Sequence, residues 1–293
     1  MNNQLQTKPK FSLAIQTDNY KKLINNTLGD PKRAAKFIAS ISSAVAINPS
    51  LQECDAGSIL AAALLGEALN LSPSPQLGQY YLVKYDKKQK INGQWVTVSS
   101  NAQFQMGYKG YIQLAIRSGQ YKDIDVIEVR EGEFLGRNKA TGKYQFEFID
   151  DEVRRESKQI IGYMAYFEYL NGFSKTLYWT KEKMMNHAKE YSQSYSSDLK
   201  NGTQYSYWSK DFNGMAFKTM LRQLISKWGV MSIDMQEALS KDMSVIKEDG
   251  TYNYIDNQEV EIESTLEVYN NTKDQEITSE DEIKPKKVNL NEL

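Results

Sequence analysis

The sequence is poor in the residues that most often carry catalysis or bind metals. It contains one cysteine, Cys54, and one histidine, His187, among 293 residues. A single thiol excludes an internal disulfide framework and suits a reducing compartment, and one thiol with one imidazole cannot form a Cys/His zinc site. The segment around His187, "TKEKMMNHAKEY", has a helical surface pattern that indicates a solvated histidine. We therefore expect no catalytic residue, no metal and no cofactor.

Long apolar runs are also missing. The longest, "ILAAALLGEALNL", is interrupted by Glu67 and is shorter than the ~20 residues that a membrane-spanning helix needs. The first fifteen residues are polar and lack the apolar core of a signal peptide. The sequence predicts a soluble, cytoplasmic protein without a membrane partner.

The charge is balanced overall but is unevenly distributed. Residues 1–231 hold 30 Lys and Arg against 21 Asp and Glu, which gives +9, whereas residues 232–293 hold 6 against 16, which gives −10. A basic body with an acidic tail suggests a polyanionic partner for the body. The tail is expected to recruit another protein or to compete for the basic surface.

The order of the local patterns predicts an α+β fold. Helical periodicity starts near Asp18, Pro31 suits a first helical turn, and Asp55 suits an N-cap. The segments "QLGQYYLVKY" and "WVTVSSNAQFQM" resemble strands joined by the turn "DKKQKINGQ", and the Asn92-Gly93 pair supports a hairpin. Further strand-like segments run to "FSKTLYWT", and helices follow. This order indicates a mainly antiparallel sheet with hairpins, covered by helices.

Three regions follow from the composition. Residues 1–17 are expected to be a flexible N-terminus, and residues 18–247 the folded core. Residues 248–293 are acidic and carry too few apolar groups for a core of their own, so we expect a largely disordered interaction tail.

The stretch "AQFQMGYKGYIQLAIRSGQ", residues 102–120, contains no acid. On a helix, Lys109, Gln113 and Arg117 would share one face over about 12 Å, because they are spaced by four residues. Two cations around an amide suit a phosphodiester backbone, and the flanking Tyr108 and Tyr111 could hold unpaired bases. Ile112, Ala115 and Ile116 would then pack inward. The alternative is a solvated basic face with core tyrosines.

A second helical segment, "KDFNGMAFKTMLRQLISKWG", keeps a narrow cationic stripe at Lys210, Lys218 and Arg222 on an otherwise apolar helix. Lysine and arginine are costly to bury without a partner, so this stripe must face an anion, a carboxylate or a groove. Together with Lys87 and Lys88 of the hairpin, which we expect to act as a mobile clamp, it favours a groove for nucleic acid.

The blocks "LGQYYLVKY", "AQFQMGYKGYIQLAIRSGQYKDI" and "FNGMAFKTMLRQLISKWG", in this order and spacing, resemble the RecT family of phage-type single-strand DNA annealing proteins, or recombinases. The resemblance covers about residues 20–235, and the core is also similar to that of Red beta. Lys84 and Val230 depart from the family pattern, in which proline is frequent at both positions. The first of these substitutions would add a cation to the groove.

The resemblance implies a cytoplasmic protein of a bacterial host cell that pairs complementary DNA strands without ATP. It also implies homo-oligomeric rings or helical filaments, a bound duplex intermediate, and partners that include an exonuclease and a single-strand binding protein. The residues agree with it, because annealing makes and breaks no covalent bond and the sequence contains no GxxxxGK[ST] loop. The expected site is then Lys109, Gln113, Arg117, Lys210, Lys218, Arg222, Lys87, Lys88, Tyr108 and Tyr111.

Two alternatives remain. A metal-dependent nuclease would use the acidic clusters "EVREGEF" and "IDDE", since strand-borne carboxylates can hold Mg²⁺. A single-strand DNA coat protein would bind without annealing. Mixing complementary oligonucleotides separates the three functions, because the outcome is annealing, cleavage or coating alone.

Overall fold

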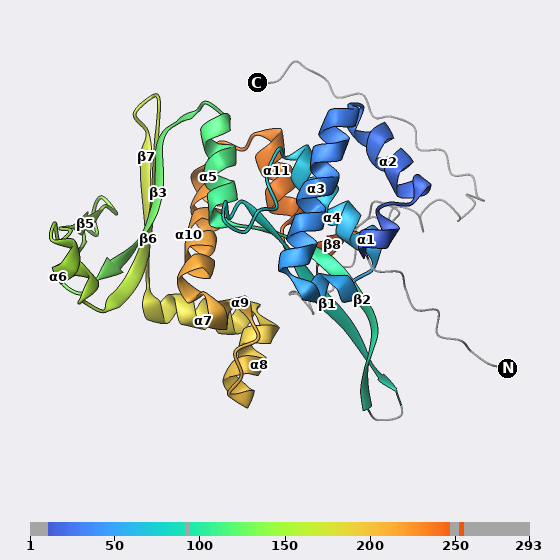
Figure 1. Ribbon diagram of the computed structural model, residues 1–293. Coiled ribbons are helices and arrows are strands. Elements are labelled where there is room, and N and C mark those ends of the chain that lie inside the picture. Colours follow the sequence, from blue (N-terminus) through green and yellow to red (C-terminus); the bar gives the residue numbers. More distant parts are fainter. Residues whose placement is uncertain (1–10, 92–93, 247–251, 255–293) are drawn as a thin grey trace, which may run out of the picture. The chain divides into compact units, whose positions relative to one another are not determined.

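The computed structural model describes residues 11–91, 94–246 and 252–254 (Figure 1). All of them belong to one unit of the chain, Met1–Asp256, and a second unit comprises Asn257–Leu293. Within the described ranges, the helices are too short or too polar to cross a membrane.

The N-terminal part is helical, as its periodicity predicts. It contains α1 (Phe11–Ala14), α2 (Asp18–Leu28), α3 (Pro31–Ile47), the short 3₁₀ helix η1 (Pro49–Glu53) and α4 (Ala56–Ala68). The side chain of Asp30 caps α3 ahead of Pro31, and Asp55 caps α4 by accepting from the Ser58 N–H at 3.1 Å. We expected residues 1–17 to be flexible, but Phe11 and Ile15 are buried in the core.

A long hairpin forms the first sheet. Strands β1 (Tyr80–Ile91) and β2 (Gln94–Met106) pair in antiparallel register from Tyr80↔Met106 to Ile91↔Gln94. The strands are longer than predicted, because Asp86–Lys90 continue β1 instead of forming a turn; Asn92 and Gly93 lie outside the described residues. The short strands β8 (Ser244–Ile246) and β9 (Tyr252–Tyr254) complete the order β1-β2-β8-β9.

Strand β9 changes the expected boundary of the acidic tail. We placed the start of the tail at residue 248, whereas β9 pairs with β8 through Ile246↔Tyr252 and Ser244↔Tyr254. The rest of residues 248–293 lies outside the described part of the chain.

The second sheet is three-stranded and antiparallel, in the order β3 (Tyr121–Arg130), β6 (Ile160–Tyr169), β7 (Ser174–Thr180). Helix α5 (Tyr108–Arg117) precedes it, and two residues after its end stands Gly119, whose φ of +68° favours glycine. Between β3 and β6 lies an insertion with the small hairpin β4 (Phe134–Arg137) and β5 (Tyr144–Phe146) and the short helix α6 (Glu152–Glu156).

Helices α7 (Lys181–Tyr191), α8 (Gln193–Asn201), α9 (Tyr207–Lys210), α10 (Phe212–Trp228) and α11 (Ile233–Lys241) follow the second sheet. Helix α10 packs on the three strands of this sheet and also against α5 (Figure 1). Its buried residues include Ala216, Met220, Leu221, Leu224 and Ile225. The predicted α+β class with antiparallel sheets and packed helices is confirmed.

Candidate nucleic-acid interface

The polar row predicted on α5 is exposed. Lys109, Gln113 and Arg117 face solvent, while Tyr111, Leu114 and Ala115 are buried on the opposite side. We expected Ile116 to pack inward, but it is 55% exposed. The buried face is centred on Tyr111 and Leu114, so the helix is rotated relative to our expectation.

A cavity opens beside this row. It has a volume of about 290 Å³ and is lined by Gln76, Leu77, Gln79, Lys109, Ile112 and Gln113. The cavity therefore lies between α5 and the loop of residues 72–79.

Glycines allow this loop to approach α5 closely. The Gly107 N–H donates to the Gln79 carbonyl at 2.9 Å. A Cβ atom at Gly107 or Gly110 would lie 2.0 or 2.1 Å from the carbonyl oxygen of Gly78 or Gln79, so only glycine fits. The side-chain carbonyl of Gln79 accepts the Ser72 N–H at 2.7 Å and closes the loop.

Two exposed lysines each lie near a tyrosine ring, and one of them, Lys109, lines the cavity. The Lys109 ammonium lies 6.0 Å from the centre of the Tyr108 ring, and the Lys210 ammonium lies 5.7 Å from that of Tyr207. Tyr81 lies between the two pairs. Its hydroxyl and the Lys109 stem would be 3.1 and 3.4 Å from a Cβ atom at Gly78, and Tyr81 also contributes to the raised pKa of Tyr207. We call Tyr81, Tyr108, Lys109, Tyr207 and Lys210 the tyrosine–lysine cluster.

Two tyrosines of this cluster, Tyr81 and Tyr207, have raised pKa values and are therefore uncharged at neutral pH. Burial raises the pKa of Tyr81, and the neighbouring Asp211 and Tyr108 raise it further. Burial also raises the pKa of Tyr207, and Tyr81 adds to the effect. The sequence analysis missed Tyr81 and Tyr207, although Tyr207 precedes Lys210 at helical spacing.

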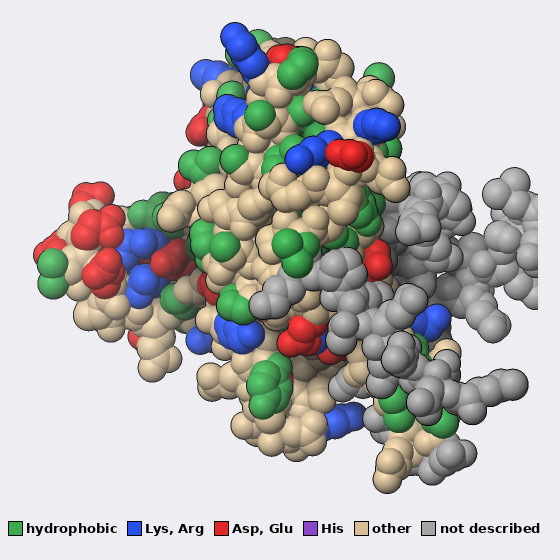
Figure 2. Space-filling model, turned by 45° about the vertical axis from the view of Figure 1, so that its right-hand side comes forward, with side chains coloured by type: hydrophobic (Ala, Val, Ile, Leu, Met, Phe, Trp, Pro, Cys, Tyr) green, Lys and Arg blue, Asp and Glu red, His purple; other side chains and the backbone are tan. Residues whose placement is uncertain are grey.

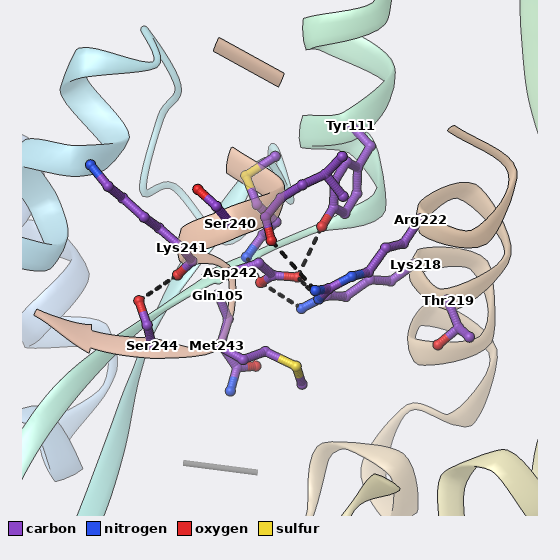
Figure 3. Close-up of polar contacts among 12 residues, drawn as sticks. Gln105, Tyr111, Lys218, Thr219, Arg222, Ser240, Lys241, Asp242, Met243 and Ser244 are labelled. Atoms are coloured by element: carbon purple, nitrogen blue, oxygen red, sulfur yellow. Dashed lines mark hydrogen bonds and ion pairs between the residues drawn. The ribbon is translucent and has the colours of Figure 1, made fainter. Parts of the chain in front are cut away.

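The predicted stripe is divided between two helices, because Lys210 ends α9 while Lys218 and Arg222 lie on α10 and face a carboxylate. Lys218 is 5% exposed, and its Nζ lies 2.9 Å from Oδ1 of Asp242, which is buried at the end of α11 (Figure 3). Arg222 places Nη1 3.1 Å from Oδ2 of the same carboxylate. The Tyr111 hydroxyl and the Met106 N–H donate to it at 2.9 and 2.8 Å. Asp242 thus joins β2, α5, α10 and the C-terminal end of α11.

The sequence left an anion, a carboxylate or a groove as possible partners of Lys218 and Arg222. The structure shows a carboxylate of the same chain, Asp242, paired with both. The ammonium of Lys218 and the ring of Tyr111 point to the interior, and burial raises the pKa of Tyr111 well above its ordinary value. The side chain of Arg222 keeps 37% of its surface exposed. A role of these three residues in DNA contact stays a prediction.

Arg117 also has an internal partner. Its guanidinium donates to the carbonyls of Leu69 at 2.8 Å and Asn70 at 3.3 Å, just after α4. These carbonyls lie at the negative end of the helix dipole, where a cation is stabilising. Arg117 therefore ties α5 to the end of α4 and remains exposed.

Comparison with known proteins places this fold in a family. The sequence profile described as "RecT family" matches residues 35–282. The chain belongs to the RecT family. It is 29% identical to the protein RecT of Escherichia coli over 226 residues, which are 72% of this chain and 75% of that protein. It is 41% identical to the uncharacterized protein YqaK of Bacillus subtilis over 225 residues, 77% of this chain and 68% of that one.

Membership of the RecT family supports a recombination protein of the single-strand annealing type.

The two hairpin lysines lie apart from the tyrosine–lysine cluster along β1. Lys87 and Lys88 pair with Ser99 and Thr97 within the strands, across a register shift, and not in a loop as expected. Lys87 is six residues from Tyr81, or about 20 Å at the rise of an extended strand. Lys84 does not add a free cation, because it forms ion pairs with Glu53 and Asp86.

Two of the acids that suggested a nuclease, Glu133 and Asp151, have partners within the fold. Glu133 is fully buried and pairs with Arg155 Nε at 2.7 Å. Burial opposes its charged form, but hydrogen bonds from the Arg130 N–H, Arg155 and the Ile149 N–H hold the pKa of Glu133 below its usual value. Asp151 caps α6. Among the residues described, no three Asp, Glu, His or Cys side chains converge as a metal site.

His187 is not solvated as predicted: it is half-buried, with its ring 5.3 Å from Trp179 and 4.6 Å from Tyr191. Figure 2 shows basic side chains that are scattered over the face drawn and mixed with acidic ones at one end. Among the described residues visible there, no continuous basic band crosses that face.

Proposed function

We propose that this RecT family chain binds single-stranded DNA at the tyrosine–lysine cluster and anneals complementary strands without ATP. The observation that carries the proposal is the placement of two exposed lysines beside three tyrosines that are at least partly exposed. Lysine binds phosphates as a point charge, and aromatic faces stack on unpaired bases regardless of sequence. This combination suits a single strand better than a duplex, whose bases are already stacked.

Annealing then follows from electrostatics. Two DNA strands repel each other through their phosphates, and bound cations remove this repulsion while releasing counterions. Because the contacts at the tyrosine–lysine cluster are to phosphates and ring faces, the Watson–Crick edges of the bases held there remain available for pairing. The protein would hold the first strand, capture the complement and retain the duplex intermediate.

In this proposal, some of the remaining predicted residues contact DNA and others support the fold. Gln113 continues the exposed row from Lys109, and Arg117 and Arg222 contribute charge at its margins. Lys218 and Tyr111 mainly support the position of α5 and α10, because both bind the buried carboxylate of Asp242. Lys87 and Lys88 would contact DNA farther along the strand.

A charge-reversal experiment tests the site. Lys109→Glu combined with Lys210→Glu should weaken binding of a labelled single strand and reduce the slope of affinity against salt concentration, because phosphate contacts are lost. Lys139→Glu, an exposed lysine in the insertion, is the matched control. Annealing is followed with complementary oligonucleotides without nucleotide, and cleavage with Mg²⁺ present. A correctly folded double variant that binds and anneals like the control would refute the assignment.

We also propose that the folded core assembles into rings or filaments and works with an exonuclease and a single-strand binding protein. The acidic tail is proposed to recruit such a partner. Because β9 ends at Tyr254, the test is a chain that ends at Asp256 and not at residue 248. Recruitment predicts normal annealing in vitro and a large loss of recombination in cells at an unchanged protein level. Recombination equal to that of the full chain would contradict it.

A further inference from the structure

The cavity beside Lys109 has a chemical character that phosphate binding does not require. Its lining combines two apolar side chains, Leu77 and Ile112, with the amides of Gln76, Gln79 and Gln113. Among the described residues that line it, none is acidic. A phosphate gains nothing from an apolar wall, whereas a planar heterocycle presents apolar faces and polar edges.

Two of the glutamines in the lining, Gln76 and Gln79, offer hydrogen-bond donors to a ligand. The side-chain carbonyl of Gln79 already accepts the Ser72 N–H at 2.7 Å, and that of Gln76 accepts the Ser74 hydroxyl at 3.0 Å. The amide nitrogens of both side chains can therefore still donate to a ligand. Base carbonyl oxygens and ring nitrogens are hydrogen-bond acceptors, so the edge of an unpaired base complements this lining.

The size and position of the cavity suit one base and not a length of strand. Its volume of about 290 Å³ is at the lower end of the usual range for ligand sites, roughly 300–1,000 Å³. Lys109 belongs both to the lining of the cavity and to the tyrosine–lysine cluster. A DNA strand with one phosphate bound to the Lys109 ammonium would therefore place the next base at the cavity. The walls are preformed, because Gly107 and Gly110 hold the loop of residues 72–79 against α5.

We infer that this cavity binds one unstacked nucleobase of the single strand, with the adjacent phosphate on Lys109. The inference rests on the proposed function and deepens it: each subunit would hold one base out of the stack while the neighbouring bases lie on the tyrosines. The base in the cavity sets the register of the strand on the protein.

The test compares two oligonucleotides of equal length and charge, oligo-dT and an abasic sugar–phosphate strand. The ratio of their dissociation constants isolates base contacts, because phosphate contacts are common to both. The full-length protein should bind oligo-dT at least tenfold more tightly, because the abasic strand lacks the base in the cavity, worth about tenfold, and also the bases on the tyrosines. Leu77→Trp and Gln113→Trp, two exposed positions that fill the cavity from opposite walls, should each reduce the ratio severalfold. Leu170→Trp, an exposed leucine at the end of β6, should leave it unchanged.

The outcomes separate the inference from the proposed function. Equal binding of both strands by the full-length protein overturns the base site while leaving phosphate binding intact. An unchanged ratio in a folded cavity variant overturns it too, and assigns the base contacts to the tyrosines. Failure to bind either strand would instead refute the proposed function. A 2-aminopurine base in the strand supplies a second readout, since a change in its fluorescence on binding should disappear in the cavity variants.

Discussion

The buried carboxylate of Asp242 holds four segments of this fold together, so we expect its substitution to be strongly destabilising. It is 1% exposed and accepts from the Lys218 ammonium, the Arg222 guanidinium, the Tyr111 hydroxyl and the Met106 N–H. Asp242→Asn keeps the shape and removes the charge. Removing one partner of a buried ion pair typically costs about 3–5 kcal/mol. Because a domain of this kind is stable by about 5–15 kcal/mol, the change consumes a large part of the total.

The measurement is urea unfolding followed by circular dichroism, which yields the free energy of unfolding in water. Glu237→Gln is the matched control, because Glu237 pairs with Lys241 on the same helix but at the surface. An exposed pair contributes about 0–1 kcal/mol, so the control should be nearly neutral. A value for Asp242→Asn within about 1 kcal/mol of the unaltered protein would refute the reasoning.

A second substitution tests the cause of that loss. If the loss comes from the charge balance around the carboxylate, adding Lys218→Met to Asp242→Asn should recover part of it, because the buried ammonium is removed. The two changes should therefore be strongly non-additive. A double variant that loses the sum of the two single effects would show that Asp242 acts through packing alone.

Two further predictions concern His187 and Gly110. Burial, with Arg222 and Lys183 nearby, lowers the pKa of His187 below 6.5 despite the opposing effect of Glu190. The unfolded chain thus binds the proton more readily, so stability should fall as the pH drops below 6.5 and His187→Gln should flatten this dependence. Because the sequence has one histidine, an NMR titration reads its pKa directly, and a value of 6.5 or higher would contradict the prediction. Replacing glycine by alanine inside a helix usually stabilises a protein by about 1 kcal/mol. Gly110→Ala should instead destabilise this protein by about 1–3 kcal/mol, because the new Cβ would lie 2.1 Å from the Gln79 carbonyl oxygen. Ser226→Ala on the exposed side of α10 is the control, and a more stable Gly110→Ala protein would disprove the close packing.

The sequence was sufficient for most local structure. Asp30, Pro31 and Asp55 marked helix starts because capping depends on residues a few positions apart, and the structure shows those caps. The four-residue spacing of Lys109, Gln113 and Arg117 placed them on one exposed face for the same reason. The family resemblance was carried by contiguous blocks and is confirmed by the family match. These features need no knowledge of distant contacts.

Tertiary structure alone decided which side chains meet. Periodicity showed that Lys218 and Arg222 share a stripe, but their partner Asp242 lies 20 residues or more along the chain and beyond the end of α10. Tyr81 and Tyr207 join Lys109 from a strand and a short helix that are far apart in sequence, and the cavity exists because the loop of residues 72–79 folds against α5. A helical or strand period fixes the direction of a side chain relative to its neighbours in sequence. It does not fix what that side chain faces, because that depends on how separate elements pack.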